Sequence, residues 1–169
     1  MQKKILLKCK NIRLIISDVD GVLTDGGMYY SNEGELCKRF HTRDGMAVEL
    51  LLNHGIKTIL ITKEKSKIAI LRAKKMNVSK IYYGITKKEA ELSGICKKYD
   101  VTPKEIMYVG DDVNDLELMR KVGFSATPKD GIGQIKKVAD YVCKAKGGEG
   151  VLREVADMLL SVKFPDSKY

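Results

Sequence analysis

Acidic side chains gather at two points where a short apolar run ends. Asp18 and Asp20 follow the run at 13–17, and the segment GDDVND at 110–115 follows the run at 106–109. If both runs are strands of one parallel sheet, both loops open at the edge where α/β sheets bind ligands. Alternate strand residues share a side, so Asp18 and Asp20 would address one bound centre. Carboxylates crowded there require a hard cation, and oxygen ligands alone favour Mg²⁺ over zinc.

Two further polar residues, Thr62 and Lys88, are placed to reach the same edge. Thr62 follows the apolar run at 57–61, and Lys88 lies near the start of a helix expected at 87–99. A nucleophilic carboxylate, a second acid, a hydroxyl, a lysine and Mg²⁺ are the components of phosphoryl transfer through an aspartyl-phosphate. Each residue taken singly has an ordinary explanation as a cap or a solvated charge, so the prediction rests on their order and position.

These residues must be positioned by regular elements, and the sequence alternates short apolar runs with longer segments at helical spacing. This pattern predicts an α/β fold with a mostly parallel sheet flanked by helices. The expected strands are 13–17, 57–61, 80–83, 106–109, 124–126 and 141–142. The expected helices are 45–53, 65–76, 87–99, 115–122, 132–138 and 151–160. Thr102, Pro103 and Glu105 have the spacing of an N-cap, a first-turn proline and a capping-box acid.

One segment interrupts this alternation directly after the first strand. Residues 28–31 and 36–40, joined by the turn-forming segment NEGE at 32–35, predict a β-hairpin. The length of 169 residues suits one compact domain. We therefore expect a single domain at 1–169, with a hairpin insertion at about 26–41 and a polar tail at about 163–169.

Composition excludes several classes of protein. Hydrophobic residues make up 44% and charged residues 31% of the chain, which is typical of a globular protein and not of a disordered or collagen-like one. The four cysteines form no CxxC pair and have no zinc-ligand spacing. The first residues lack a signal-peptide core, and no apolar run approaches the roughly 18 residues of a membrane span. We expect a cytoplasmic protein with no membrane partner.

The ordered motifs resemble those of a known superfamily. DVDGVLTDG at 18–26, Thr62 after its strand, Lys88 and GDDVND at 110–115 are similar to the four motifs of the haloacid dehalogenase (HAD) superfamily of phosphatases. The hairpin, FHTRDG at 40–45 and GGEG at 147–150 resemble its capless branch, which acts on 2-keto-3-deoxy sugar acid phosphates. The resemblance implies a Rossmann-like HAD fold with an inserted hairpin and no cap domain.

The resemblance also implies roles for the catalytic residues. Asp18 would be the nucleophile, and Asp20 would protonate the leaving alkoxide and then activate the hydrolytic water. Thr62 and Lys88 would hold the phosphoryl oxygens, with Lys88 also tempering the charge on Asp18. One departure is Lys63, which stands where members of the family commonly have a glycine that lets the backbone approach the phosphate.

The same resemblance assigns the cofactor. Mg²⁺ would be bound by the carboxylates of Asp18 and Asp111, by the backbone carbonyl of Asp20, and by Asp112 acting through water. A carboxylate can attack a dianionic phosphate only if the metal and a lysine screen their repulsion, so this assignment agrees with the chemistry.

Substrate choice is expected to depend on residues outside this shared set. The positions that resemble substrate-binding positions of the branch are Arg43, Glu64, Arg72, Lys75 and Glu149. Octulosonate-type members typically have arginine at the position of Glu64 and GGRG in place of GGEG, whereas the nine-carbon type has an acid at both. The sequence therefore favours a nonulosonate (KDN or sialic acid) 9-phosphate, with 3-deoxy-D-manno-octulosonate 8-phosphate as the alternative.

Partners follow from the hairpin and from the charge. In the resembling branch, such hairpins associate at the centre of a tetramer, which implies a homotetramer. The net charge of +9 is compatible with anionic partners, but the lysines are dispersed and no nucleic-acid motif is present, so we expect none of that class. A non-catalytic receiver-like domain is the alternative of another class, and Asp20, two residues after Asp18, argues against it because a receiver needs no such acid.

Overall fold

A six-stranded parallel sheet forms the centre of the computed structural model, which describes residues 3–166. Its order is β5-β4-β1-β6-β7-β8, with each neighbouring pair parallel. The strands are β1 (Leu14–Ser17), β4 (Lys57–Ile61), β5 (Lys80–Tyr82), β6 (Ile106–Val109), β7 (Phe124–Thr127) and β8 (Tyr141–Val142). The expected α/β class is therefore confirmed. The order reverses at β1, which lies between β4 and β6, and that reversal places a crevice at the carboxyl end of β1.

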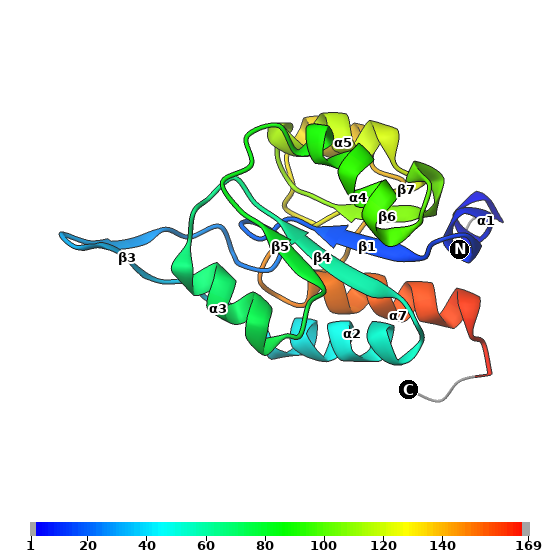
Figure 1. The fold of residues 1–169 in the computed structure, drawn as a ribbon, viewed down its shortest axis with the longest axis horizontal. Helices are drawn as coiled ribbons and strands as arrows, with labels where there is room; N and C mark the ends of the chain where they lie inside the picture. Colours follow the sequence, from blue (N-terminus) through cyan, green and yellow to red (C-terminus); the bar gives the residue numbers. More distant parts are fainter. Residues whose placement is uncertain (1–2, 167–169) are drawn as a thin grey trace.

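Helices cover both faces of this sheet (Figure 1). On one face lie α2 (Thr42–Asn53), α3 (Lys67–Lys75) and α7 (Val151–Lys163), with α1 (Lys3–Lys10) against α7. On the other lie α4 (Leu92–Tyr99), α5 (Leu116–Lys121) and α6 (Gly133–Val138). Three short 3-10 turns complete the connections: η1 (Lys88–Glu91), η2 (Pro103–Glu105) and η3 (Val113–Asp115). Within 3–166, no helix has the length and apolarity needed to cross a membrane.

Strand β1 shows how the apolar runs hold the two layers together. All four of its residues are buried, as expected for a central parallel strand covered on both faces. Ile15 packs in the core beneath α2 and α7, whereas Leu14 and Ile16 pack in the core beneath α4 and α5. This alternation fixes the register of β1, and hence the direction in which the loop after Ser17 leaves the sheet.

Several boundaries differ from the sequence expectation. The sequence does not predict helix α1, because lysines interrupt its apolar residues. The helix nevertheless packs against the core through Ile5 and Cys9, which are four residues apart and so share one face. The capping box at Thr102 and Glu105 is confirmed, but its helix is a single turn because β6 begins at Ile106. Helix α7 runs on to Lys163 and Phe164 packs against the core, so the expected tail begins later; residues 167–169 lie outside the described part of the chain.

The expected hairpin is present and extends away from the body of the molecule (Figure 1). It consists of β2 (Tyr29–Ser31) and β3 (Gly34–Cys37), which pair antiparallel with Ser31 opposite Gly34. The turn is therefore Asn32-Glu33, shorter than the four residues expected, and Gly34 already belongs to the second strand with a positive φ of 118°. In the described chain, nothing larger than this hairpin separates β1 from α2.

A buried carboxylate joins α2 to α7. Helix α7 begins after Gly150, which has no side chain to cap it. Asp44, on the first turn of α2, supplies the missing acceptor: its Oδ1 accepts a hydrogen bond of 3.0 Å from the backbone N–H of Arg153. Asp44 is only 1% exposed, and burial raises its pKa to about 6. The FHTRDG segment thus has a structural function in addition to any contact with substrate.

This contact predicts a stability difference between two substitutions. Asp44→Ala leaves the N-terminus of α7 without its acceptor and should lower the free energy of unfolding by about 1–2 kcal/mol. Asp44→Asn keeps an oxygen acceptor of the same size and should lose clearly less. Denaturant unfolding of the three proteins at one pH measures both values, and equal losses for Ala and Asn would contradict the assigned role.

Candidate active site

The loops after β1, β4 and β6 enclose a cavity of about 230 Å³ at the carboxyl edge of the sheet. All its lining residues belong to the segments that the sequence singled out or to their neighbours. They are Asp18, Asp20, Gly21, Gly26, Thr62, Lys63, Glu64, Asp111, Asp112 and Asn114. The parallel register brings these loops together because Ser17 pairs with both Leu60 and Val109. The expected convergence of the acidic clusters is therefore confirmed.

A buried lysine lies at the base of this cavity. Lys88, the first residue of η1, is 0% exposed, and its Nζ lies 2.7 Å from Asp18 Oδ2 and 2.6 Å from Asp115 Oδ1. Burial lowers the pKa of Lys88, but the two carboxylates outweigh this effect and raise it. The lysine therefore stays charged and holds Asp18 through its Oδ2 atom. The other oxygen of Asp18, Oδ1, accepts a hydrogen bond of 2.7 Å from the N–H of Val19.

Asp115 anchors this arrangement and was not among the expected catalytic or metal-binding residues. Its Oδ1 accepts hydrogen bonds from Lys88 and from the hydroxyl of Tyr108, and its Oδ2 accepts from the N–H groups of Asp111 (2.8 Å) and Asp112 (3.2 Å). These four donors leave it little capacity to bind a metal, so we assign it the role of orienting Lys88 and the loop after β6. The capping-box position of Asp115, three residues after Asp112, was the available sequence signal.

The remaining oxygens fit a hard divalent cation. Among the described residues, Asp18, Asp111 and Asp115 each offer a carboxylate oxygen within 4.8 Å of the other two. Because the oxygens of Asp115 already accept four hydrogen bonds, Asp18 and Asp111 are the members of this group that fit a cation. Asp111 Oδ1 and Asn114 Oδ1 are buried without a hydrogen-bond partner in that part of the chain, which is the state expected of ligand atoms. Gly21 allows the two loops to meet, because a Cβ at its position would lie 2.1 Å from Asp111 Oδ2.

Electrostatics in the absence of a metal also point to a cation. Burial, together with the carboxylate of Asp115, raises the pKa of Asp18 to about 8 and that of Asp111 to about 7. At neutral pH, Asp18 would then be mostly protonated and Asp111 about half protonated, because Lys88 alone does not offset their desolvation; a cation between the two carboxylates would favour the ionised form of both.

Asp20 and Thr62 both line the cavity and are in direct contact there. Thr62, which is 1% exposed, donates a hydrogen bond of 3.2 Å from its hydroxyl to Asp20 Oδ2. The other carboxylate oxygen of Asp20 contacts Lys38 Nζ at 2.6 Å. The sequence reasoning missed Lys38, because its position on the hairpin gave no indication that it would reach the loop after β1.

The expected substrate-binding residues are not all in one place. Glu64 lines the cavity of the aspartates, together with the exposed Lys63. Arg72 and Lys75 instead line a separate cavity of about 400 Å³ between α2 and α3. Arg72 is already engaged there, because it donates a hydrogen bond of 3.0 Å to the carbonyl of His41 and stacks over Phe40.

Arg43 and Glu149 are exposed and line neither of these two cavities. Their loops are nevertheless neighbours, since a Cβ at Gly150 would lie 4.0 Å from the Cβ of Arg43. The GGEG loop also approaches the loop after β1, where the N–H of Gly148 donates to the carbonyl of Val22 (3.0 Å). The expected contacts of Arg43 and Glu149 with substrate therefore stay predictions.

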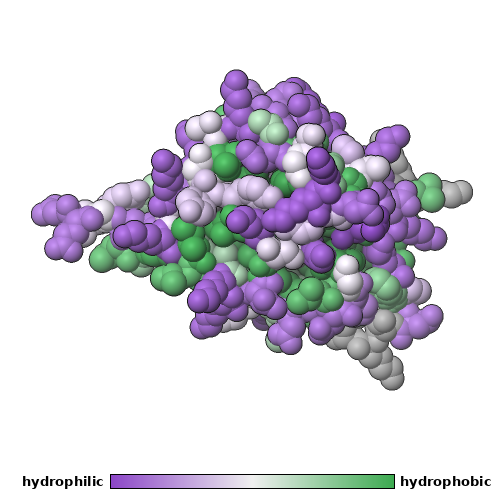
Figure 2. Space-filling model, in the orientation of Figure 1, coloured by the Kyte–Doolittle hydropathy of each residue, from purple (hydrophilic) through white to green (hydrophobic). Residues whose placement is uncertain are grey.

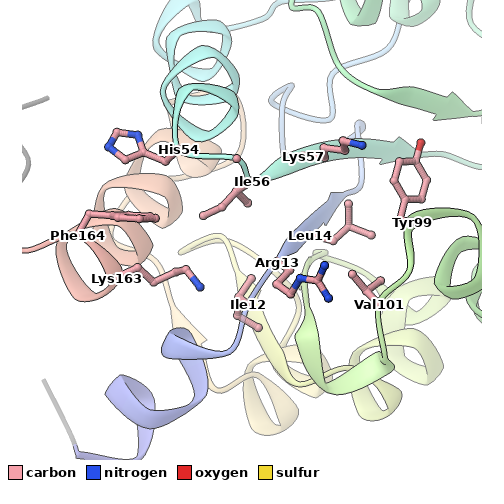
Figure 3. A pocket seen from close by; sticks show the side chains of 11 residues that line it. Ile12, Arg13, Leu14, His54, Ile56, Lys57, Tyr99, Val101, Lys163 and Phe164 are labelled. Carbon is pink, nitrogen blue, oxygen red and sulfur yellow. The ribbon is translucent and has the colours of Figure 1, made fainter.

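Another cavity, of about 320 Å³, lies at the opposite edge of the sheet, where β1 and β4 begin (Figure 3). Its basic side chains already have partners. Arg13 donates to the carbonyl of Asp100 and to Glu105, Lys163 donates to the carbonyl of Lys10, and Lys57 lies over the ring of Tyr99. This cavity has no acidic lining residue, so it lacks the groups for phosphoryl transfer.

Comparison with known proteins agrees with this geometry. Residues 51–155 match the haloacid dehalogenase-like hydrolase family. The chain is 39% identical over 156 residues to the 3-deoxy-D-manno-octulosonate 8-phosphate phosphatase of Escherichia coli strain K12, covering 92% of this chain and 83% of that protein. The crystal structure of the Yersinia pestis phosphatase of the same name superposes with a TM-score of 0.93 at 33% identity, covering 96% of this chain and 88% of that one.

A third relative carries ligands. The structure of the Moraxella catarrhalis 3-deoxy-D-manno-octulosonate 8-phosphate phosphatase in complex with a magnesium ion, a phosphate ion and KDO is 35% identical, with a TM-score of 0.92. The match covers 96% of this chain and 94% of that one. With its aspartates, threonine and buried lysine at one sheet edge, the chain belongs to the haloacid dehalogenase-like hydrolase family and is a phosphoric monoester hydrolase.

Proposed function

We propose that this protein is a Mg²⁺-dependent phosphatase that releases the terminal phosphate of 3-deoxy-D-manno-octulosonate 8-phosphate through an aspartyl-phosphate. The observation that carries the proposal is the buried pair of Asp18 and Lys88 beside the unpartnered oxygen of Asp111. Asp18 lines the cavity, and the charge of Lys88 beside it reduces the repulsion between this carboxylate and a phosphate. The names and ligands of the relatives support the choice of substrate.

The reaction follows from the positions of the two aspartates. A carboxylate oxygen of Asp18 attacks phosphorus, and the bond from phosphorus to the sugar oxygen breaks. Asp20, at the mouth of the cavity, takes up a proton from water as the substrate binds and gives that proton to the departing oxygen. In the second step Asp20 takes a proton from water, which attacks the aspartyl-phosphate and restores Asp18. Thr62 and Lys88 hold phosphoryl oxygens and limit the charge that accumulates on them.

Asp18 and Asp111 would hold the metal, together with the backbone carbonyl of Asp20 and with Asp112 acting through a water. When bound, Mg²⁺ screens the negative charge of the phosphate from that of Asp18. Residues of the chain contribute the remaining electrostatics: Lys88 Nζ lies 2.7 Å from Asp18 Oδ2, and Lys63 offers a further positive charge at the cavity.

The length of the sugar acid is the finer part of the proposal. The relatives described above are named for the eight-carbon substrate, which favours the octulosonate over the nonulosonate that the sequence motifs suggested. The nonulosonate 9-phosphate stays as the second candidate because Glu64, an acid at a position where octulosonate-type members typically have arginine, lines the cavity.

The proposal includes a homotetramer built through the hairpin. Met28, Tyr29, Tyr30 and Leu36 are exposed on the hairpin or next to it, with Leu36 at 64% and Tyr30 at 57%. Figure 2 shows hydrophobic surface where the hairpin leaves the body. Both strands of such a short hairpin are edges, and association would cover them together with these side chains. Light scattering at assay concentration measures the mass directly.

A phosphate-release screen tests the proposed function. With Mg²⁺, we expect the highest kcat/KM on octulosonate 8-phosphate, lower values on KDN and N-acetylneuraminate 9-phosphates, and weak turnover of para-nitrophenyl phosphate. Asp18→Asn and Asp20→Asn should each lose at least about a hundredfold in kcat, because an amide neither attacks phosphorus nor exchanges a proton. A stable phosphoenzyme without turnover would instead identify a receiver-like domain, and a preference for a nine-carbon substrate would overturn the eight-carbon assignment.

Metal binding should depend on pH. The pKa of Asp18 is raised to about 8 and that of Asp111 to about 7, so below these values a cation must displace protons from its own ligands. We expect the dissociation constant for Mg²⁺, measured by calorimetry without substrate, to rise at least about tenfold from pH 8.5 to pH 6.5. Calorimetry in two buffers of different ionisation heat should show proton release. A pH-independent constant would contradict the raised pKa values.

Glu64 should influence the choice between sugars. Glu64→Arg replaces an acceptor for sugar hydroxyls with a donor that attracts the substrate carboxylate. We expect the ratio of kcat/KM for octulosonate 8-phosphate to that for a nonulosonate 9-phosphate to rise about tenfold, which corresponds to about 1.4 kcal/mol. Turnover of para-nitrophenyl phosphate, which contacts only the shared core, is the control. Equal losses on all three substrates would show that Glu64 supports the fold or the phosphate site.

A further inference from the structure

The side chain of Lys38 is buried although the residue belongs to the projecting hairpin. It directly follows β3, and its side chain is only 1% exposed. The ammonium lies 2.6 Å from Asp20 Oδ1 and 3.0 Å from Glu35 Oε1. A lysine is rarely buried to this extent without a specific partner, and here the partner is the general acid and base of the proposed reaction.

Lys38 is held in place by Glu35, which is in turn bound to Ser66 on the body of the molecule. Glu35, three residues earlier on the hairpin, accepts a hydrogen bond from the hydroxyl of Ser66 through its second oxygen. Ser66 is the N-cap of α3 and also accepts from the N–H of Ala69 (3.1 Å). The ammonium is therefore anchored to the start of a helix on the body of the molecule, and it does not depend on the hairpin alone for its position.

The two oxygens of Asp20 consequently have different partners. Oδ1 is held by Lys38, and Oδ2 accepts from the hydroxyl of Thr62 (3.2 Å). In the proposed reaction Thr62 turns to a phosphoryl oxygen, which frees Oδ2 beside the departing sugar oxygen. Lys38 keeps the carboxylate in place through Oδ1 during this exchange, because its own anchors at Glu35 and Ser66 lie outside the phosphate site.

We propose that Lys38 is the positioning residue for Asp20, aiming Oδ2 of that carboxylate at the leaving oxygen. The proposal rests on the proposed phosphatase function and adds a residue that neither the sequence motifs nor the comparisons assign. It also gives the hairpin a part in the chemistry, since β3 carries Glu35 and Lys38 directly follows it.

The test compares two leaving groups. An alkoxide needs a proton as it departs, whereas para-nitrophenolate does not, so misplacing Asp20 should affect the sugar phosphate more. The ratio kcat/KM covers the steps up to departure of the leaving group, which confines the comparison to the step in which Asp20 acts as an acid. For Lys38→Met we expect a loss of about tenfold or more on the sugar phosphate and about threefold or less on para-nitrophenyl phosphate. Lys38→Arg should recover most of the loss on the sugar phosphate.

A matched control is the neighbouring Arg39, whose ion pair with Asp25 is exposed and 3.5 Å long. Arg39→Met should leave both kcat/KM values unchanged. If Lys38→Met does not fold, Glu35→Gln and Ser66→Ala loosen the same lysine without removing its charge and should show the same dependence on leaving group. Equal losses on both substrates, no loss, or failure of Lys38→Arg to recover activity would overturn the proposal. Inactivity of the unsubstituted protein on every sugar phosphate would overturn the proposed function instead.

Discussion

The site depends on one buried positive charge, the ammonium of Lys88 between Asp18 and Asp115. Removing three charged groups from water is costly, and the arrangement persists only because each charge has close partners of the opposite sign. Asp115 contributes most to this balance, since Tyr108 and two backbone N–H groups also donate to it. Lys88 therefore joins the loop after β1 to the loop after β6, and the position of Asp18 follows from the order of the strands.

Because the strand order sets the position of Asp18, the sheet and the residues at its carboxyl edge could be predicted from the sequence. The six strands of the parallel sheet lie within one residue of their expected positions, because their apolar runs are short and the central ones are buried on both faces. The second strand of the hairpin, expected at 36–40, lies instead at Gly34–Cys37. Asp18, Thr62 and Asp111 follow directly from the strands of the parallel sheet, since such a sheet brings all its carboxyl ends to one edge. The spacing of local motifs and a single topological rule were sufficient for this part of the site.

The parts that could not be predicted depend on side chains that reach across the fold. Nothing near Lys38 in the sequence indicates that its ammonium meets Asp20, eighteen residues away, because that contact needs the hairpin to fold back over the loop after β1. Arg72 shows a second effect of packing, and its expected contact with substrate stays a prediction. Helical spacing placed it beside Lys75 as expected, but the packing of α3 on α2 directs both residues into a different cavity from that of the aspartates.

The small number of residues at the mouth of the cavity constrains how this protein selects a substrate. Its core supplies the phosphate chemistry, and the inserted hairpin is too short to cover the site as a domain would. For the proposed function, discrimination would then come from Glu64 and Lys63, which line the cavity, or from loops that the hairpin would bring near through association. Lys38 connects that same hairpin to Asp20, and Glu35 holds Lys38. In the proposed reaction, an assembly that orders the hairpin would therefore also order the acid. The proposed function would in this way couple substrate selection and proton transfer through one hairpin, formed by β2 and β3.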